Sequence, residues 1–149
     1  MSTRALVRVI PRQEGLSYSE GHNHVDKALC NMYHHYDGYP QYLGVKLAEF
    51  VKDLEVGSGA GGKIYKRANG AGCLAAQMIA FFKDCVGNIY LHDHKHDLDH
   101  AGWEEYIYTL YPKEGEPTWI SIYKTYEQDV IFVGTANKLI KKYGETEEN

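Results

Sequence analysis

The segment Gly72–Val86 restricts the possible folds of this chain more than any other stretch, because it is apolar on nearly every side of a helix. Leu74, Met78 and Phe82 fall on one side of that helix, and Ile79 widens the apolar surface. A helix with this pattern has to be buried on most sides. Since most of the remaining chain is strand-like, we expect the helix to lie across a sheet.

The strands and the other helices follow from hydrophobic periodicity. Strands are expected at Thr3–Ile10, Lys27–Tyr36, Asn88–His92, Glu104–Tyr111, Thr118–Tyr126 and Val130–Val133. A helix is expected at Gln41–Leu54 and a short one at Thr135–Tyr143, whereas Pro11–Asp26 should form a long exposed hairpin connection and Glu55–Gly62 a flexible glycine-rich loop. This order indicates one α+β domain over residues 1–149: a mainly antiparallel sheet of about five or six strands, with two main helices on one face.

The composition limits the classes of partner. The 149 residues carry a net charge of −4 and contain no long basic run, which argues against duplex nucleic acid. A small anionic ligand remains compatible, because a local pocket needs no basic surface. No apolar run approaches the roughly 18 residues of a membrane span, and the N-terminus leads directly into a strand pattern, so neither a span nor a signal peptide is expected. Cys30, Cys73 and Cys85 lack CxxC spacing and have apolar neighbours, which predicts buried thiols in a reducing cytoplasm.

The segment Tyr33–Pro40 (YHHYDGYP) is the first candidate site, because polar aromatic residues gather where a strand gives way to a helix. Adjacent histidines in a strand point to opposite faces and do not chelate one metal together. We expect one histidine to pack, and the other, paired with Asp37 or Tyr39, to face a cleft. His35, Asp37 and Tyr39 are the candidate ligand residues. The alternative is that Asp37 caps the helix and Gly38 takes a positive φ to make the turn.

A second candidate site precedes the apolar helix, in the segment Lys63–Gly72. Its small residues let backbone N–H groups approach an anion at the helix start, and Arg67 stands nearby to pair with phosphate. Arg67, Asn69 and Gly70 are therefore candidate anion-binding residues. The order of residues is not that of a P-loop, and the alternative is a solvated loop with Asn69 as helix N-cap.

The histidine-rich stretch Leu91–His100 has a composition that attracts transition metals. It is, however, one contiguous polar connection, whereas metal enzymes gather their ligands from separate rigid elements. We therefore expect a solvated connection that holds no stoichiometric metal.

Tyrosines are concentrated in the later strands, where Tyr106 and Tyr108 share one face and Trp119 and Tyr123 share another. Aligned aromatic rings on a sheet can stack a nucleobase. They serve equally well as a core layer or as an interface between copies of the chain. Because phenols desolvate cheaply and still hydrogen-bond, we expect a homo-oligomer, with a dimer as its simplest form.

Three sequence features together resemble one family: Ser2-Thr3-Arg4-Ala5, the pattern Tyr33-x-His35-x-Asp37-Gly38-Tyr39-Pro40, and Asn69-Gly70 before a buried helix. The family is a group of small, mostly uncharacterised proteins of phages, archaeal viruses and prophages, and the resemblance covers most of residues 3–125. It implies a viral protein in the cytoplasm of a host cell. By analogy with other small viral proteins, it suggests a role against host defence that sequesters or cleaves nucleotide signals.

The leading hypothesis is a binding protein, without catalysis or cofactor, for a small nucleotide-derived phosphorylated ligand. Arg67 and the backbone of Asn69–Gly72 would hold phosphate, Tyr106 or Tyr39 would stack the base, and His35 and Asp37 would read its polar edges. One alternative is a phosphodiesterase-like hydrolase that uses His35 as acid or base. A third class is an inhibitor that binds a host defence protein through its aromatic face.

Overall fold

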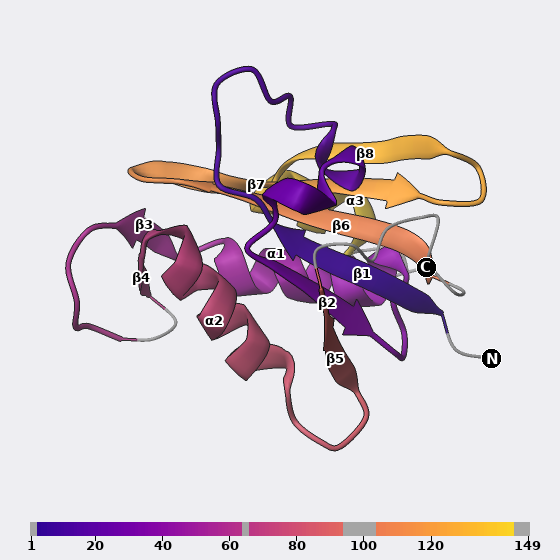
Figure 1. Cartoon of the computed structure of the whole chain (residues 1–149), viewed down its shortest axis with the longest axis horizontal. Helices are drawn as coiled ribbons and strands as arrows, with labels where there is room; N and C mark the ends of the chain where they lie inside the picture. The colour runs from indigo at the N-terminus through magenta and orange to yellow at the C-terminus, as the bar shows by residue number, and fades with distance from the viewer. Residues whose placement is uncertain (1–2, 64–65, 94–103, 145–149) are drawn as a thin grey trace.

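Six strands form one mixed sheet in the order β5-β2-β1-β6-β7-β8 within the residues that the computed structural model describes, which are 3–63, 66–93 and 104–144 (Figure 1). The strands are β1 (Arg4–Val9), β2 (Cys30–His34), β5 (Ile89–His92), β6 (Glu104–Lys113), β7 (Glu116–Lys124) and β8 (Asp129–Thr135). Strands β1 and β6 pair in parallel, and every other neighbouring pair is antiparallel. The predicted α+β fold with a mainly antiparallel sheet is confirmed.

Three α-helices share one hydrophobic core with a single face of this sheet. They are α1 (Val45–Val51), which continues a π-helical turn at Pro40–Gly44, α2 (Gly70–Phe82) and α3 (Ala136–Tyr143). The sheet contributes Val7, Met32 and Tyr108 to this core, and all three side chains are fully buried. Helix α2 is less enclosed than predicted, because Ala76, Ala80 and Phe81 are exposed on its outer side.

Two short strands were not expected from the sequence. β3 (Glu55–Gly57) and β4 (Arg67–Asn69) pair in parallel, and β4 leads directly into α2. Each strand has three residues, which is too short for periodicity to reveal. Together they hold the ends of the glycine-rich segment close to the N-terminus of α2.

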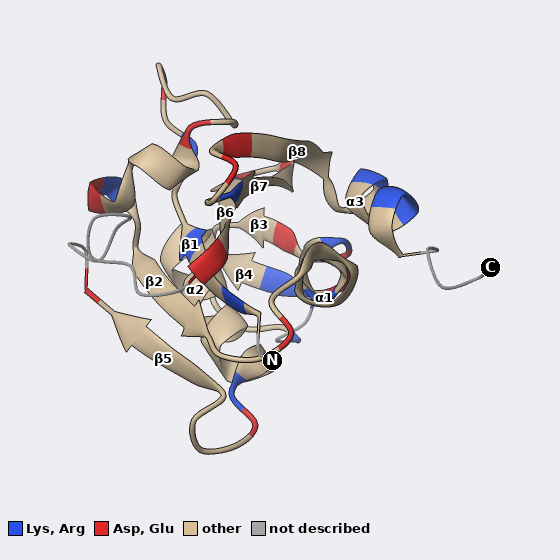
Figure 2. Cartoon of the chain, turned by 90° about the vertical axis from the view of Figure 1, so that its right-hand side faces the viewer, with Lys and Arg blue, Asp and Glu red and all other residues tan. Residues whose placement is uncertain are grey.

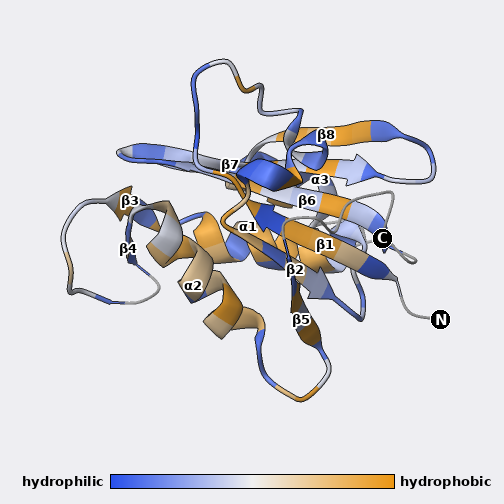
Figure 3. Ribbon diagram, viewed as in Figure 1, coloured by the Kyte–Doolittle hydropathy of each residue, from blue (hydrophilic) through white to orange (hydrophobic). Residues whose placement is uncertain are grey.

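Residues 11–29, in the connection between β1 and β2, join two neighbouring antiparallel strands as the predicted hairpin connection, but the connection is only partly exposed. We call it the strap, because it folds back over the sheet face that the helices leave uncovered (Figure 1). Its Leu16 is buried, Tyr18 stacks on Trp119 with ring centroids 4.7 Å apart, and His22 stacks on Tyr123 at 3.7 Å. Figure 3 shows the strap as mainly hydrophilic.

Arg8 is the polar anchor under the strap. This side chain is fully buried on β1, where its Nε donates to Oδ1 of Asn31 at 3.1 Å. Its Nη1 donates to the carbonyl oxygen of His22 at 3.0 Å and to that of Gly21 at 3.5 Å. The buried guanidinium thus joins β1, β2 and the strap, which explains why a cation is tolerated in this position.

The aromatic residues of the later strands are used within a single chain. Tyr108 and Tyr111 are fully buried, the first under the helices and the second under the strap. Tyr123 is also buried and Trp119 is partly covered by the strap. The strap therefore occupies much of the aromatic surface from which a homo-oligomer was expected, and the oligomer stays a prediction.

Candidate functional site

The turn after β2 is built by close backbone approach. The N–H of Gly38 donates to the carbonyl oxygen of Thr3 at 2.8 Å, and a Cβ on Gly38 would lie 2.8 Å from the Cβ of Ala5. The glycine is required by this contact and not by the positive φ that the sequence suggested. Asp37 takes the left-handed conformation instead, with φ of 54°. A non-glycine residue in that region is sterically costly, and such strain is often found at ligand sites.

The helix start places Asp37 outside the capping position. Tyr39 is the N-cap residue, and no side chain in the described part of the protein caps the helix, so the expected cap by Asp37 is not formed. Pro40 occupies the first helical turn as predicted. Among the described residues, the Asp37 carboxylate has no hydrogen bond or ion pair, which leaves it available to a ligand.

A cavity of about 490 Å³ opens beside this turn, between the end of β2, the start of the first helix and the C-terminal end of α2. We call it the turn cleft, and its lining residues are His34, Tyr36, Asp37, Tyr42, Lys46, Phe81, Phe82, Asp84, Cys85 and Asn88. Its volume is within the usual range for small-molecule sites. Aromatic rings form much of its wall, and ionisable groups stand among them.

His34 is the most buried ionisable group of the turn cleft. The side chain is 7% exposed, and its Nδ1 is buried without a hydrogen-bond partner among the described residues. Burial lowers the pKa of His34; Asp37 raises it and Lys46 lowers it, each by a smaller effect. The imidazole is therefore neutral near pH 7, with one nitrogen that donates and one that accepts.

Asn88 carries the second buried polar atom of the turn cleft. Its Nδ2 donates to the carbonyl oxygen of Phe82 at 2.6 Å and to Oδ1 of Asp84 at 3.0 Å. Its own Oδ1 is buried and has no partner in the described part of the chain. Native structures leave few buried polar atoms unpaired. His34 and Asn88 both line the turn cleft, so two of the buried unpartnered polar atoms in the described residues belong to side chains at this cavity.

The charges of the turn cleft are mixed. Asp37 and Asp84 contribute carboxylates, and Lys46 contributes one ammonium group, which lies 5.1 Å from the centroid of the Tyr42 ring. Lys46 has no ion pair among the described residues. Elsewhere, basic side chains are scattered over several elements and do not gather on one face in the view of Figure 2. Lys46 is thus a local cation, suited to one anionic group.

His35 lies on the other face of the sheet from the turn cleft. Its Nδ1 is 2.9 Å from the hydroxyl oxygen of Tyr33, and its ring is edge-on to Tyr36 at 4.6 Å. Tyr33 also packs against His92, with centroids 5.4 Å apart. Of the two adjacent histidines, His34 therefore joins Asp37 in the cleft, and the structure does not bring His35 and Asp37 together in one site.

Arg67, Asn69 and Gly70 organise the glycine-rich segment at the opposite end of α2. The Arg67 guanidinium donates to the carbonyl oxygens of Gly61 and Ser58, both at 3.1 Å. Oδ1 of Asn69 accepts from the N–H of Gly59 at 3.0 Å, so Asn69 does not cap α2 with its side chain. The 13 residues of α2 separate this region from the turn cleft by on the order of 20 Å. The two predicted halves of the ligand site are therefore not joined.

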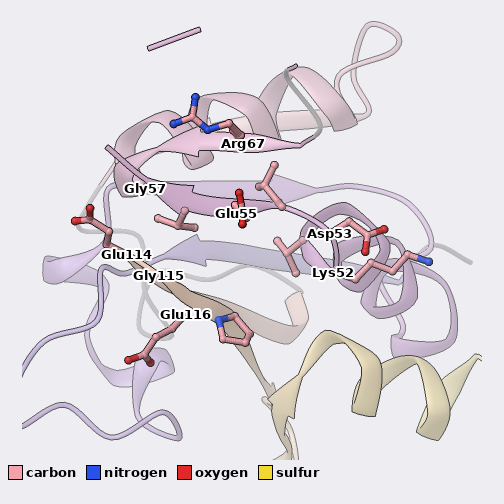
Figure 4. A pocket seen from close by; sticks show the side chains of 12 residues that line it. Lys52, Asp53, Glu55, Gly57, Arg67, Glu114, Gly115 and Glu116 are labelled. Atoms are coloured by element: carbon pink, nitrogen blue, oxygen red, sulfur yellow. The ribbon is translucent and has the colours of Figure 1, made fainter. Parts of the chain in front are cut away.

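A larger cavity of about 540 Å³ lies beside Arg67 (Figure 4). Its floor includes the buried Val56, and its rim carries charged residues whose ends point in different directions. Glu116 at this rim pairs with Lys113 at 3.4 Å. None of the buried unpartnered polar atoms in the described residues lines this cavity. It is therefore a weaker candidate than the turn cleft, despite its size.

The three predicted tyrosines differ in their positions. Tyr108 is fully buried and donates its hydroxyl hydrogen to the carbonyl oxygen of Gly38, which makes it a support of the turn. Tyr106 is partly buried beside it, with ring centroids 6.2 Å apart. Tyr39 is exposed and lies next to Tyr42, which does line the turn cleft.

The described residues add two observations that bear on metals and membranes. No group of three or more His, Cys, Asp or Glu side chains in them is arranged to hold a metal ion. Most of the histidine-rich stretch, residues 94–100, lies outside the described residues, so its expected lack of metal stays a prediction. Within the described chain, no helix is both long and apolar enough to cross a membrane.

Cys85 differs from the sequence expectation for the cysteines. It is exposed at the turn cleft, whereas Cys30 and Cys73 are half-buried. Its apolar neighbour Val86 is also exposed, so an apolar flank was a poor guide to burial at the end of α2.

Comparison with known proteins gives no relative from which a function could be transferred. No family model, no curated protein and no solved structure matches the chain. The assignment of the turn cleft as the candidate site therefore depends on its own geometry.

Proposed function

We propose that the protein binds a small nucleotide-derived, phosphorylated ligand in the turn cleft and holds it without turnover. The observation that supports this most directly is that two side chains lining one cavity, His34 and Asn88, each carry a buried polar atom that has no partner among the described residues. A bound ligand would supply the missing hydrogen bonds, and each buried group left unpaired costs about 1–3 kcal/mol.

The lining of the cleft suits the parts of a nucleotide. Tyr36, Tyr42 and Phe81 offer exposed aromatic surface for a base. Lys46 offers a cation for a phosphate group. Asp37, which stands on the turn fixed through Gly38, offers acceptors for the hydrogen-bond donors of the base.

The arrangement favours binding over hydrolysis. In the described residues, His34 makes no hydrogen bond to Asp37 or to Cys85, so no nucleophile and base are paired in the cleft. A neutral, buried imidazole fits a fixed donor and acceptor. The resemblance to viral proteins adds the proposal that the ligand is a nucleotide signal of the host and that binding sequesters it in the host cytoplasm.

Binding is tested with a panel of nucleoside monophosphates and cyclic di- and oligonucleotides, by calorimetry. Lys46→Gln and Asp84→Asn should weaken binding at least about tenfold if the turn cleft is the site. Lys141→Gln on α3, which is exposed, is the matched control for loss of a charge and should leave binding unchanged. If Arg67→Gln weakens binding and Lys46→Gln does not, the ligand binds at the glycine-rich segment instead.

The fate of the ligand separates binding from hydrolysis. The protein is incubated with the nucleotide that binds, denatured, and the released nucleotide is analysed by mass. Intact ligand supports sequestration, whereas a shortened product supports the phosphodiesterase alternative. If no nucleotide binds, the proposal fails and a protein partner, such as a host defence protein, becomes the leading class.

A further inference from the structure

The polar lining of the turn cleft bears on the base of the ligand as well as on its phosphate, because it includes several hydrogen-bond acceptors. Asp37 and Asp84 contribute carboxylate oxygens, which accept hydrogen bonds. The unpartnered Oδ1 of Asn88 is also an acceptor, and its orientation is fixed because Nδ2 already donates to Phe82 and Asp84. A ligand that fits this lining has to present several donors.

Asp37 is exposed at the turn cleft and can accept two parallel hydrogen bonds through its two carboxylate oxygens. Both oxygens of this carboxylate lack a partner in the described part of the chain, whereas Asp84 already accepts from Asn88 through Oδ1. The Asp37 backbone is held by the Gly38 N–H bond to Thr3 and by the Tyr108 bond to the Gly38 carbonyl. The backbone that carries Asp37 is therefore positioned before the ligand arrives.

The common bases differ in what they offer a carboxylate. Guanine presents a ring N–H and an exocyclic amino group side by side, so both can donate to the two oxygens of one carboxylate. Adenine and cytosine place an acceptor nitrogen beside the amino group, and uracil places carbonyl oxygens beside its ring N–H. Guanine also carries a carbonyl oxygen that the single N–H of a neutral imidazole, such as that of His34, satisfies.

Resting on the proposed function, we infer that the ligand of the turn cleft is a guanine nucleotide, whose ring N–H and amino group are read by Asp37. Binding leaves all covalent bonds of the nucleotide intact. The aromatic wall that includes Tyr42 covers the base, and Lys46 faces the phosphate.

The inference is tested by calorimetry with GMP, IMP, AMP, CMP and guanosine. IMP lacks only the amino group of GMP, and it should bind at least about tenfold more weakly, with AMP weaker still. Guanosine should bind more weakly than GMP, because it has no phosphate for Lys46. Asp37→Asn should reduce the preference for GMP over IMP to less than about threefold, because an amide offers one acceptor only. Asp53→Asn at the larger cavity is the matched control and should keep the full preference.

Each outcome decides between the two proposals. Equal affinities for GMP, IMP and AMP would overturn the guanine assignment while leaving nucleotide binding intact. A preference for GMP over IMP that persists in the Asp37→Asn variant would show that Asp37 does not recognise the base. Binding of none of the five compounds, together with none of the cyclic or oligomeric nucleotides, would overturn the proposed function itself.

Discussion

The hydroxyl group of Tyr108 donates a hydrogen bond of 2.6 Å to the carbonyl oxygen of Gly38. The tyrosine stands in the centre of β6 and is fully buried, whereas Gly38 belongs to the turn that carries Asp37. Burial raises the pKa of Tyr108 well above its usual value, so the hydroxyl stays protonated and remains a donor. The core of the sheet therefore fixes one side of the candidate site directly.

Tyr108→Phe should destabilise the protein, because it leaves the buried carbonyl of Gly38 without its donor. The expected loss in the free energy of unfolding is about 1–3 kcal/mol, measured by urea denaturation. Tyr126→Phe is the control for loss of a hydroxyl, since Tyr126 is 65% exposed, and it should change stability little. Equal stability of the Tyr108→Phe variant and the wild type would show that the bond does not support the turn.

Gly38→Ala should be destabilising for a steric reason. The added Cβ would lie 2.8 Å from the Cβ of Ala5 and 2.9 Å from the carbonyl oxygen of Thr3, so the turn has to move away from β1. We expect a loss of about 1–3 kcal/mol in a urea titration. Gly72→Ala is the matched control, because its Cβ meets nothing within 4 Å and alanine favours the helix. A neutral Gly38→Ala variant would contradict the close approach of the turn to β1.

Hydrophobic periodicity was sufficient to predict the six strands of the main sheet and the helices, with ends displaced by a few residues, but not the three-residue strands β3 and β4. It could not predict the strap, because polar residues conceal the contacts that attach it. The position of the strap depends on Arg8, whose acceptors include backbone carbonyls of Gly21 and His22. No residue pattern marks a carbonyl as the partner of a distant arginine.

The sequence located the turn but not the composition of its cleft. Alternation along the strand predicted that the two histidines face opposite sides of the sheet. It could not predict which of them faces the helices, and in the structure this is His34, which lines the turn cleft. Lys46, Asp84 and Asn88 are contributed by other elements, and only the three-dimensional fold brings them to the turn. The residues near Gly70 that were predicted to bind phosphate lie at the far end of α2, and this separation also depends on the three-dimensional fold.

Arg8→Met should detach the strap. Methionine fills a similar volume but leaves the buried Oδ1 of Asn31 and the partly buried carbonyl oxygen of His22 without the guanidinium, which should cost on the order of 3 kcal/mol. Limited proteolysis should then cut within residues 11–29 faster than in the wild type. Lys27→Met, at an exposed strap position, is the control for loss of a positive charge. Unchanged protection of the strap would mean that its other contacts, such as the aromatic stacking and the Gly21 N–H bond to the Tyr111 hydroxyl, are sufficient to hold it.

Stability should fall as the pH is lowered through the titration of His34. Burial lowers the pKa of His34 in the folded state, so the unfolded chain binds its proton first, near the ordinary pKa of about 6.5. The folded state therefore loses stability as the pH falls below about 6.5, and the loss ends below the lowered pKa. His22 contributes in the same direction, because burial and Arg8 lower its pKa. Melting temperatures from pH 8 to pH 4.5 should decline less steeply for His34→Gln than for the wild type; parallel curves would exclude His34 as a source.

The rate at which Cys85 is alkylated should show whether a ligand occupies the turn cleft. Cys85 is exposed at the cleft, whereas burial raises the pKa of Cys30 to about 11 and keeps that thiol protonated and slow to react. The Sγ of Cys73 donates to Oε1 of Gln77 on α2, outside the cleft. With iodoacetamide at pH 8, followed by peptide mass analysis, Cys85 should be alkylated first. Saturating GMP should slow the alkylation of Cys85 severalfold and leave Cys73 unaffected, because only Cys85 shares the cavity with the ligand. If bound GMP protects Cys73 instead, or neither cysteine, the nucleotide occupies another part of the molecule.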